Sequence, residues 1–133
     1  MFLQYYVTDS TTGNRVNIEI DAATKADLDA TRNGWQTVWN TDFILDPQKE
    51  KYAAKTEDGE IIALGAYCVR KGSVAVYIAY IESQPESNPT LVEHKKYSGI
   101  GKAMIAFGIQ LSIDASCNGV VVFEAKTDDL EQH

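Results

Sequence analysis

The sequence has 133 residues, enough for one domain with a hydrophobic core and too few for two domains of ordinary size. Hydrophobic residues make up 44% and charged residues 23%, a balance that excludes a disordered or fibrous chain. The formal net charge of -7 argues against nucleic acid and anionic membrane surfaces as partners and accommodates a cationic one more easily.

No apolar run reaches the roughly 20 residues that a membrane span requires, and the first residues lack the basic and apolar parts of a secretory signal. A cytoplasmic location is therefore expected. The two cysteines, Cys68 and Cys117, stand alone in apolar surroundings. They are predicted to be buried free thiols, because neither metal-ligand spacing nor a disulfide framework is present.

Two strands and a turn are predicted at the start of the chain. Residues 2–8 and 15–20 read as strands, and the polar segment DSTTGN between them offers Gly13 for a positive φ. A hairpin is therefore expected to open the fold.

Residues 23–40 are predicted to form a helix, with Asp21 or Thr24 as its N-cap. Gly34 weakens this pattern, because glycine is a poor helix former. The apolar stripe consists of Leu28, Trp35, Val38 and Trp39. Its two tryptophans are interpreted as core residues, with the wall of a substrate site as the alternative.

Three more strands are predicted at residues 51–56, 60–70 and 73–83, separated by EDG and KG. Such short separators favour an antiparallel meander. The third segment, SVAVYIAYIES, is apolar on both faces and is expected inside the sheet. Residues 84–96 are predicted to be irregular, because Pro85 and Pro89 interrupt them.

A helix is predicted from Ile100, ending near Asn118 and Gly119. It is expected to be largely covered, because apolar residues occupy most of its surface. The segment GVVVFEA, residues 119–125, then reads as a buried strand. Residues 73–125 are therefore expected to form a right-handed βαβ unit with parallel strands.

The loop before this helix has the sequence KKYSGIGK, residues 95–102. A helix N-terminus presents unpaired N–H groups and the positive end of the helix dipole, so it suits phosphate. Gly99 and Gly101 would let an anion approach the backbone, while Lys96 and Lys102 add positive charge. The alternatives are a glycine needed only for the turn, and lysines that are ordinary solvated side chains.

Two common phosphate-binding loops do not fit this segment. A P-loop would need glycine in place of Lys96 and Ser or Thr in place of Ala103. A dinucleotide-binding loop would need glycine or alanine in place of Met104.

The segment KYSGIG, residues 96–101, resembles the signature of the GNAT superfamily of N-acetyltransferases: Arg or Gln, two residues, Gly, one residue, then Gly or Ala at a helix start. Lysine replaces the usual first residue. The hairpin, the tryptophan-containing helix, the meander, YIESQP and GVVVFEAKT extend the likeness over nearly the whole chain. The resemblance implies a single acyltransferase-like domain over residues 1–133, with an α/β (α+β) fold in which an antiparallel meander precedes the βαβ unit.

The resemblance also implies acetyl-CoA as cosubstrate and a primary amine as acceptor. Backbone groups of Ile81 and Ser83 are then expected at the acetyl and pantetheine end, and the glycine loop at the pyrophosphate. The loop residues implied in cofactor binding are Lys96, Tyr97, Ser98, Gly99, Ile100, Gly101 and Lys102.

Two side chains near the end of the predicted strand are candidates for catalysis. Glu82 is the candidate general base, directly or through water, and Tyr80 is a weaker candidate for an acid or a substrate contact. The alternatives are a glutamate that binds substrate charge or faces solvent, and a tyrosine packed in the core. Glu124 fits a structural or a substrate-orienting role equally. No metal is predicted, because His94 has no second ligand at metal spacing.

Members of the superfamily usually continue with another helix and two strands beyond the point where this sequence ends. The sequence is therefore expected either to lack that part or to complete its sheet with a second chain, which would make a homodimer. Two function classes follow: an N-acetyltransferase, or a catalytically degenerate module that binds CoA or a partner without turnover.

Overall fold

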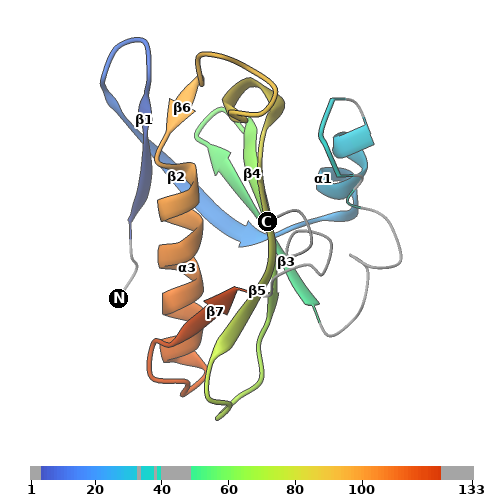
Figure 1. Cartoon of the computed structure of the whole chain (residues 1–133), viewed down its shortest axis with the longest axis vertical. Helices are drawn as coiled ribbons and strands as arrows, with labels where there is room; N and C mark the ends of the chain where they lie inside the picture. Colours follow the sequence, from blue (N-terminus) through green and yellow to red (C-terminus); the bar gives the residue numbers. More distant parts are fainter. Residues whose placement is uncertain (1–3, 33, 38, 40–48, 124–133) are drawn as a thin grey trace, which may run out of the picture.

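The computed structural model describes residues 4–32, 34–37, 39 and 49–123, which form a mixed α/β fold. Seven strands make one sheet in the order β6-β1-β2-β3-β4-β5-β7. All neighbouring strands are antiparallel except β5 and β7, which are parallel. Helices α1 and α3 lie on opposite sides of this sheet (Figure 1).

The described elements have the following bounds. The strands are β1 (Tyr5–Asp9), β2 (Arg15–Ala22), β3 (Lys49–Thr56), β4 (Ile61–Cys68), β5 (Val76–Ser83), β6 (Tyr97–Ser98) and β7 (Val121–Phe123). The helices are α1 (Lys25–Asp29) and α3 (Ile100–Asp114), with the short 3-10 helices η1 (Ala30–Arg32) and η2 (Pro85–Ser87). None of these helices is long and apolar enough to cross a membrane.

The predicted hairpin is confirmed, but the long helix predicted for residues 23–40 is wrong. Strands β1 and β2 pair around a turn in which Gly13 has a φ of +75°. Helix α1 covers only Lys25–Asp29, and Gly34 has a φ of +90°, which a helix cannot accommodate. Thr24 is the N-cap, and it forms a capping box with Asp27. Val38, which was assigned to the apolar stripe, lies outside the described residues.

The antiparallel meander is confirmed, with strand ends shifted by a few residues. Strands β3, β4 and β5 pair in sequence, and the turns between them contain Gly59 (φ +85°) and Gly72 (φ +75°). The segment between β5 and β6 is irregular apart from η2. It leads to β6, which pairs with Thr8 and Asp9 of β1 and was not predicted.

A β-bulge changes which face each residue of β5 occupies. In the pairing with β4, Ala66 is opposite Tyr80 and Tyr67 is opposite Ile78, so Ala79 has no partner. Ile78 packs in the cluster under α3, whereas Ala79 and Tyr80 both pack on the α1 side. The bulge therefore turns the end of β5 over, and it places Tyr80 and Glu82 on the face opposite α3.

Helix α3 begins at Ile100 as predicted but ends at Asp114, four residues before Asn118. The first left-handed residue beyond it is Ser116, with a φ of 63°, so the predicted stop at Asn118 and Gly119 is wrong. The following strand is parallel to β5, as expected for the βαβ unit. Glu124 lies outside the described residues.

The core divides between the two faces of the sheet. On the α3 face, Tyr67 donates a hydrogen bond to the Met104 carbonyl (2.8 Å). A Cβ on Gly65 would lie 2.7 Å from the Tyr67 ring and 2.9 Å from Met104, so only glycine fits there. On the α1 face, Leu28 and Trp39 pack on β4 and β5. Neither cysteine forms a disulfide, as predicted, and Cys117 is buried as predicted, whereas Cys68 is only half-buried.

Candidate functional site

The glycine loop forms the N-terminus of α3. Gly99 is the N-cap in the left-handed conformation (φ 87°, ψ 9°), and the first backbone bond of the helix runs from Ala103 N–H to the Gly99 carbonyl (3.1 Å). The N–H groups of Ile100, Gly101 and Lys102 therefore precede the hydrogen-bond ladder of the helix and lie at the positive end of its dipole.

The two glycines of this loop differ in what the fold requires of them. Gly99 has a positive φ, which accounts for glycine at that position. Gly101 lies within the helix at an ordinary φ, and a Cβ there would meet nothing within 4 Å. Neither backbone conformation nor packing accounts for glycine at position 101, although glycine weakens a helix.

A groove of about 580 Å³ adjoins this helix start. One wall comes from β1 and the residue before it, and the other comes from the glycine loop and the first turns of α3. Lys102 is the only basic side chain on it among the described residues. The lining residues are Gln4, Tyr5, Tyr6, Val7, Thr8, Ser98, Gly99, Lys102, Ala103 and Ala106.

The backbone groups of Ile81 and Ser83 point away from β4. The Gln84 N–H donates to the Ile62 carbonyl of β4 (2.8 Å). Since antiparallel residues alternate in direction, Ser83 and Ile81 direct their N–H and C=O groups to the other edge of β5. The described pairing with β7 covers Val76–Ile78, so both residues lie beyond it.

The structure brings Ile81 close to the helix start. Its side chain packs against the core cluster that includes Ile100, Ala103 and Met104. The two halves of the predicted cofactor site, the edge of β5 at Ile81 and Ser83 and the N-terminus of α3, therefore share one patch of core.

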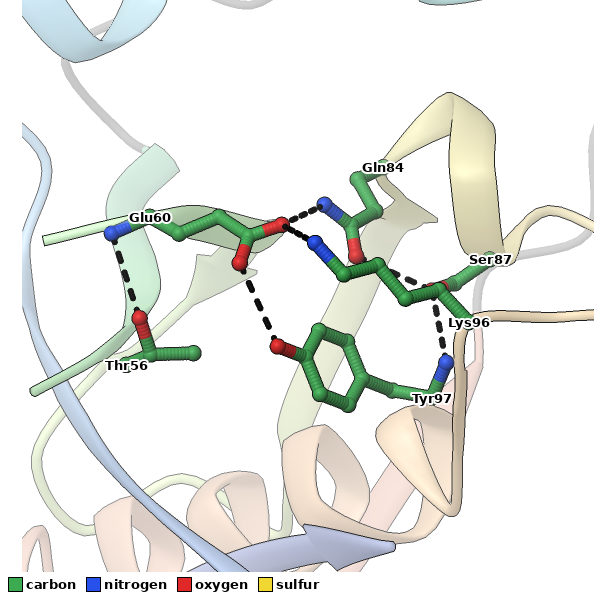
Figure 2. A network of polar contacts seen from close by, with 6 residues as sticks. All are labelled: Thr56, Glu60, Gln84, Ser87, Lys96 and Tyr97. Carbon is green, nitrogen blue, oxygen red and sulfur yellow. Dashed lines mark hydrogen bonds and ion pairs between the residues drawn. The ribbon is translucent and has the colours of Figure 1, made fainter. Parts of the chain in front are cut away.

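Lys96 and Tyr97, by contrast, are both bound by Glu60, which immediately precedes β4. Figure 2 shows this arrangement: the Lys96 ammonium lies 2.9 Å from Glu60 Oε2, and the Tyr97 hydroxyl donates to Oε1 (3.2 Å). Gln84, directly after β5, donates its side-chain N–H to Oε2 as well (2.8 Å).

Ser87 completes a closed ring of hydrogen bonds with Gln84, Glu60 and Tyr97. It donates to Gln84 Oε1 (3.0 Å) and accepts the backbone N–H of Tyr97 (3.1 Å). The Tyr97 N–H is thus already paired within the protein, unlike the amides that begin α3. Residues Glu60, Gln84, Ser87, Lys96 and Tyr97 are called the Glu60 network below (Figure 2).

The ionisation of the Glu60 network follows from these contacts. Burial raises the pKa of Glu60, but the hydrogen bonds from Gln84 and Lys96 outweigh it and hold the pKa below its ordinary value. The hydrogen bond to Glu60 raises the pKa of Lys96. The pair is therefore fully charged at neutral pH.

Glu82, the predicted base, is only 4% exposed and has its carboxylate occupied. Oε2 accepts the Gln36 N–H (2.6 Å), and Oε1 accepts the Thr37 N–H (3.2 Å) and the Trp39 indole N–H (2.9 Å). Tyr80 accepts a hydrogen bond from the Thr37 hydroxyl (2.9 Å). Both candidate catalytic side chains thus hold the segment after α1, on the face opposite the glycine loop.

The described residues contain no group of three His, Cys, Asp or Glu side chains that could hold a metal ion. His94 lies in the irregular segment before β6, beside Lys95 and Lys96. No protein-family model matches this sequence, and no curated protein matches it either. The molecule is thus defined as a mixed α/β protein with an open glycine loop at a helix N-terminus.

Sequence reasoning missed Glu60, the residue that joins the end of β5 to the start of the glycine loop. Its partners lie 24, 36 and 37 positions away along the chain. The only signal in the sequence was that Glu60 and Lys96, which carry opposite charges, each stand at the boundary of a predicted element. No periodic pattern shows that these two boundaries meet in the fold.

Proposed function

We propose that this protein binds acetyl-CoA and transfers its acetyl group to a primary amine. The observation that carries the proposal is Gly101, whose missing side chain leaves the positive end of α3 open although the fold gives no reason for it. An anion the size of a pyrophosphate needs such an approach to the backbone. The groove beside Gly99 and Lys102 gives room for the rest of a nucleotide-bearing ligand.

The residues of this chain supply mainly binding and orientation. The N–H groups of Ile100, Gly101 and Lys102 would hold the pyrophosphate, and the backbone groups of Ile81 and Ser83 would hold the pantetheine arm by its amides. Acetyl-CoA supplies the thioester: the neutral amine attacks its carbonyl carbon, the C–S bond breaks, and the proton lost by the nitrogen is taken up by the departing thiolate, which gives the amide and the CoA thiol. Fixing both reactants in one geometry accounts for a large part of the acceleration in such a reaction.

The test is calorimetric titration of acetyl-CoA into the wild-type chain and the Gly101→Ala variant. Alanine is expected to stabilise the helix by about 0.5–1 kcal/mol, because it forms helices better than glycine. It is also expected to weaken acetyl-CoA binding by roughly tenfold or more, because its methyl group stands where the anion approaches. Gln110→Ala, further along α3, is the control and should leave binding unchanged.

Two results would reject the cofactor site. One is the absence of saturable binding to the wild type at millimolar acetyl-CoA. The other is a Gly101→Ala variant that gains stability and binds as tightly as the wild type, since glycine would then have no role in approach of the ligand.

A second function, a CoA-binding module without turnover, is favoured by one observation. Both oxygens of Glu82 already accept N–H groups, which leaves the predicted base little capacity to take a proton from an acceptor. Incubation with radiolabelled acetyl-CoA and cationic amines, such as a polyamine and an aminoglycoside, distinguishes the two. Binding without acetyl transfer would support the module, and acetylated product would support the enzyme.

A further inference from the structure

Glu60 receives three hydrogen bonds from two segments that are separate in sequence but meet at the candidate site. Gln84 follows the end of β5, Lys96 precedes β6, and Tyr97 is the first residue of β6. The donor atoms lie 2.8, 2.9 and 3.2 Å from the carboxylate. Glu60 therefore fixes the start of the glycine loop against the strand that carries the other half of the site (Figure 2).

Tyr97 is held on both its side chain and its backbone. Its hydroxyl donates to Glu60, its N–H donates to Ser87, and Ser87 in turn donates to Gln84. The donors of this ring therefore run in two arms from Tyr97, one direct and one through Ser87 and Gln84, and both arms end at the Glu60 carboxylate. Two residues later the chain reaches Gly99, where the left-handed turn aims the first N–H groups of α3.

Lys96 is committed to the same carboxylate. Its ammonium forms an ion pair with Glu60, and its backbone N–H donates to the Glu86 carbonyl (2.8 Å). Lys102, which is exposed on the first turn of α3, lies on the groove instead. The two lysines that flank the glycines therefore have different surroundings.

We propose that Glu60 is a positioning residue for the glycine loop, and that Lys96 acts through Glu60 instead of contacting the bound anion. This inference rests on the proposed function, because the ligand it concerns is acetyl-CoA at the N-terminus of α3. It assigns the direct positive charge of the site to Lys102 and the backbone amides.

The first experiment is a double-mutant cycle on acetyl-CoA affinity. Glu60→Gln keeps the shape of the side chain but turns an N–H group toward the donors, and it is expected to raise the Kd roughly fivefold. Adding Lys96→Met to Glu60→Gln should change the Kd by less than about twofold, since Lys96 then has no partner to act through. Lys102→Met is the matched control and should weaken binding by the same factor with or without Glu60.

Two outcomes of the cycle would overturn the proposal. Lys96→Met could weaken binding equally in both backgrounds, which would make Lys96 a direct ligand. Glu60→Gln could leave the Kd unchanged, which would remove any positioning role. Tyr97→Phe, which removes only the hydroxyl, provides the same test should the Glu60 variant fold poorly, and it is expected to raise the Kd.

The second experiment is amide hydrogen exchange without ligand, which separates this proposal from the proposed function. Glu60→Gln should speed exchange of the Lys96 and Tyr97 N–H groups, which are paired with Glu86 and Ser87. The Ala23 N–H, which pairs with the Lys51 carbonyl, should be unaffected. Faster local exchange supports the positioning role even if acetyl-CoA fails to bind, and unchanged exchange contradicts it even if acetyl-CoA binds.

Discussion

Glu60, directly before β4, and Glu82, near the end of β5, each accept three hydrogen bonds, and they differ mainly in burial. Glu82 is buried and binds the segment after α1, whereas Glu60 is partly exposed and binds the start of the glycine loop. Buried acceptors are costly to leave unpaired, while exposed ion pairs contribute little to stability. Substitution at Glu82 should therefore mainly affect stability, and substitution at Glu60 mainly the arrangement of the loop.

Gln84→Glu is expected to destabilise the protein by about 1–3 kcal/mol at pH 7, because the new carboxylate loses the N–H donor and faces Glu60 across a 2.8 Å contact. Two carboxylates so close raise the pKa of one of them. The destabilisation should therefore shrink as the pH falls to about 4.5, where a proton can be shared between them. Urea unfolding of the variant and the wild type at pH 7 and at about pH 4.5 measures the loss of unfolding free energy. Gln84→Met is the control, and an equal pH dependence in both variants would contradict this account.

Asp27→Asn is expected to cost about 1 kcal/mol of stability at pH 7. Burial raises the pKa of Asp27, but the Thr24 N–H and Lys55 (2.9 Å) outweigh it, so the pKa is lower than usual. A carboxyl whose pKa is lower in the folded than in the unfolded protein stabilises the fold at pH values above its unfolded pKa, near 3.9. That stabilisation is lost as the pH falls through the pKa of the folded protein. The difference between variant and wild type should therefore narrow below about pH 4 in urea unfolding. A gap that stays constant to pH 3 would show that the charge is irrelevant.

At the scale of elements, the segment after α1 shows how a periodic pattern can mislead. Leu28 and Trp39 do pack in one cluster, as a helical stripe would predict. They reach it from separate places, because the helix ends at Asp29 and the chain turns at Gly34. The spacing of apolar residues correctly predicts that Leu28 and Trp39 are buried together, but it does not predict the backbone conformation of the residues between them.

Glu82→Gln is expected to loosen this segment before the sheet unfolds. The amide can accept fewer of the three N–H groups from Gln36, Thr37 and Trp39, which should cost about 1–3 kcal/mol locally. Tryptophan fluorescence, which reports Trp35 and Trp39, should change at lower urea than far-ultraviolet circular dichroism, which reports the sheet. Coincident transitions at the wild-type midpoint would contradict a local anchoring role.

The meander and the start of α3 were predictable because their signals are local. Turn glycines fix the hairpins at Gly13, Gly59 and Gly72, and each has the positive φ that the turn needs. Three residues after α3 have a positive φ, namely Ser116, Asn118 and Gly119. The sequence signal at Asn118 and Gly119 was recognised, but not that Ser116 takes this conformation first. The glycine loop could be read from sequence, but the Glu60 network could not, because its contacts depend on which strand ends meet.

At the scale of the whole molecule, α3 approaches the sheet over two glycines. Gly65 lies under Met104 and the Tyr67 ring, and a Cβ on Gly108 would be 3.2 Å from the same ring. The sheet and the helix can approach closely only because these positions carry no side chain. One helix thus covers the face on which the largest part of the described core lies.

Gly65→Ala is expected to destabilise the whole fold by about 1–3 kcal/mol, since the added methyl group pushes against the ring of Tyr67 and the end of Met104. Fluorescence and circular dichroism should shift together to lower urea, because the contact joins helix and sheet. Gly101→Ala, where a methyl group meets open space, is the natural comparison and should shift the midpoint the other way. A Gly65 variant as stable as the wild type would show that α3 can move away at little cost.

The unpaired residue Ala79 has a consequence for how this gene can change over time. Before Ala79, the even-numbered residues Val76 and Ile78 face α3. After it, the odd-numbered residue Ile81 does, so the alternation of faces is reversed at the bulge. Substitutions along β5 change one contact at a time. Loss of the single codon for Ala79 would remove only the residue without a partner on β4, and regular alternation would then keep Ile81 under α3 and Glu82 on the other face. A codon inserted between Tyr80 and Ile81 would instead exchange the environments of Ile81 and Glu82 and move a carboxylate under α3. We expect a deep mutational scan to retain the in-frame deletion of Ala79, while an in-frame insertion between Tyr80 and Ile81 is lost from the library.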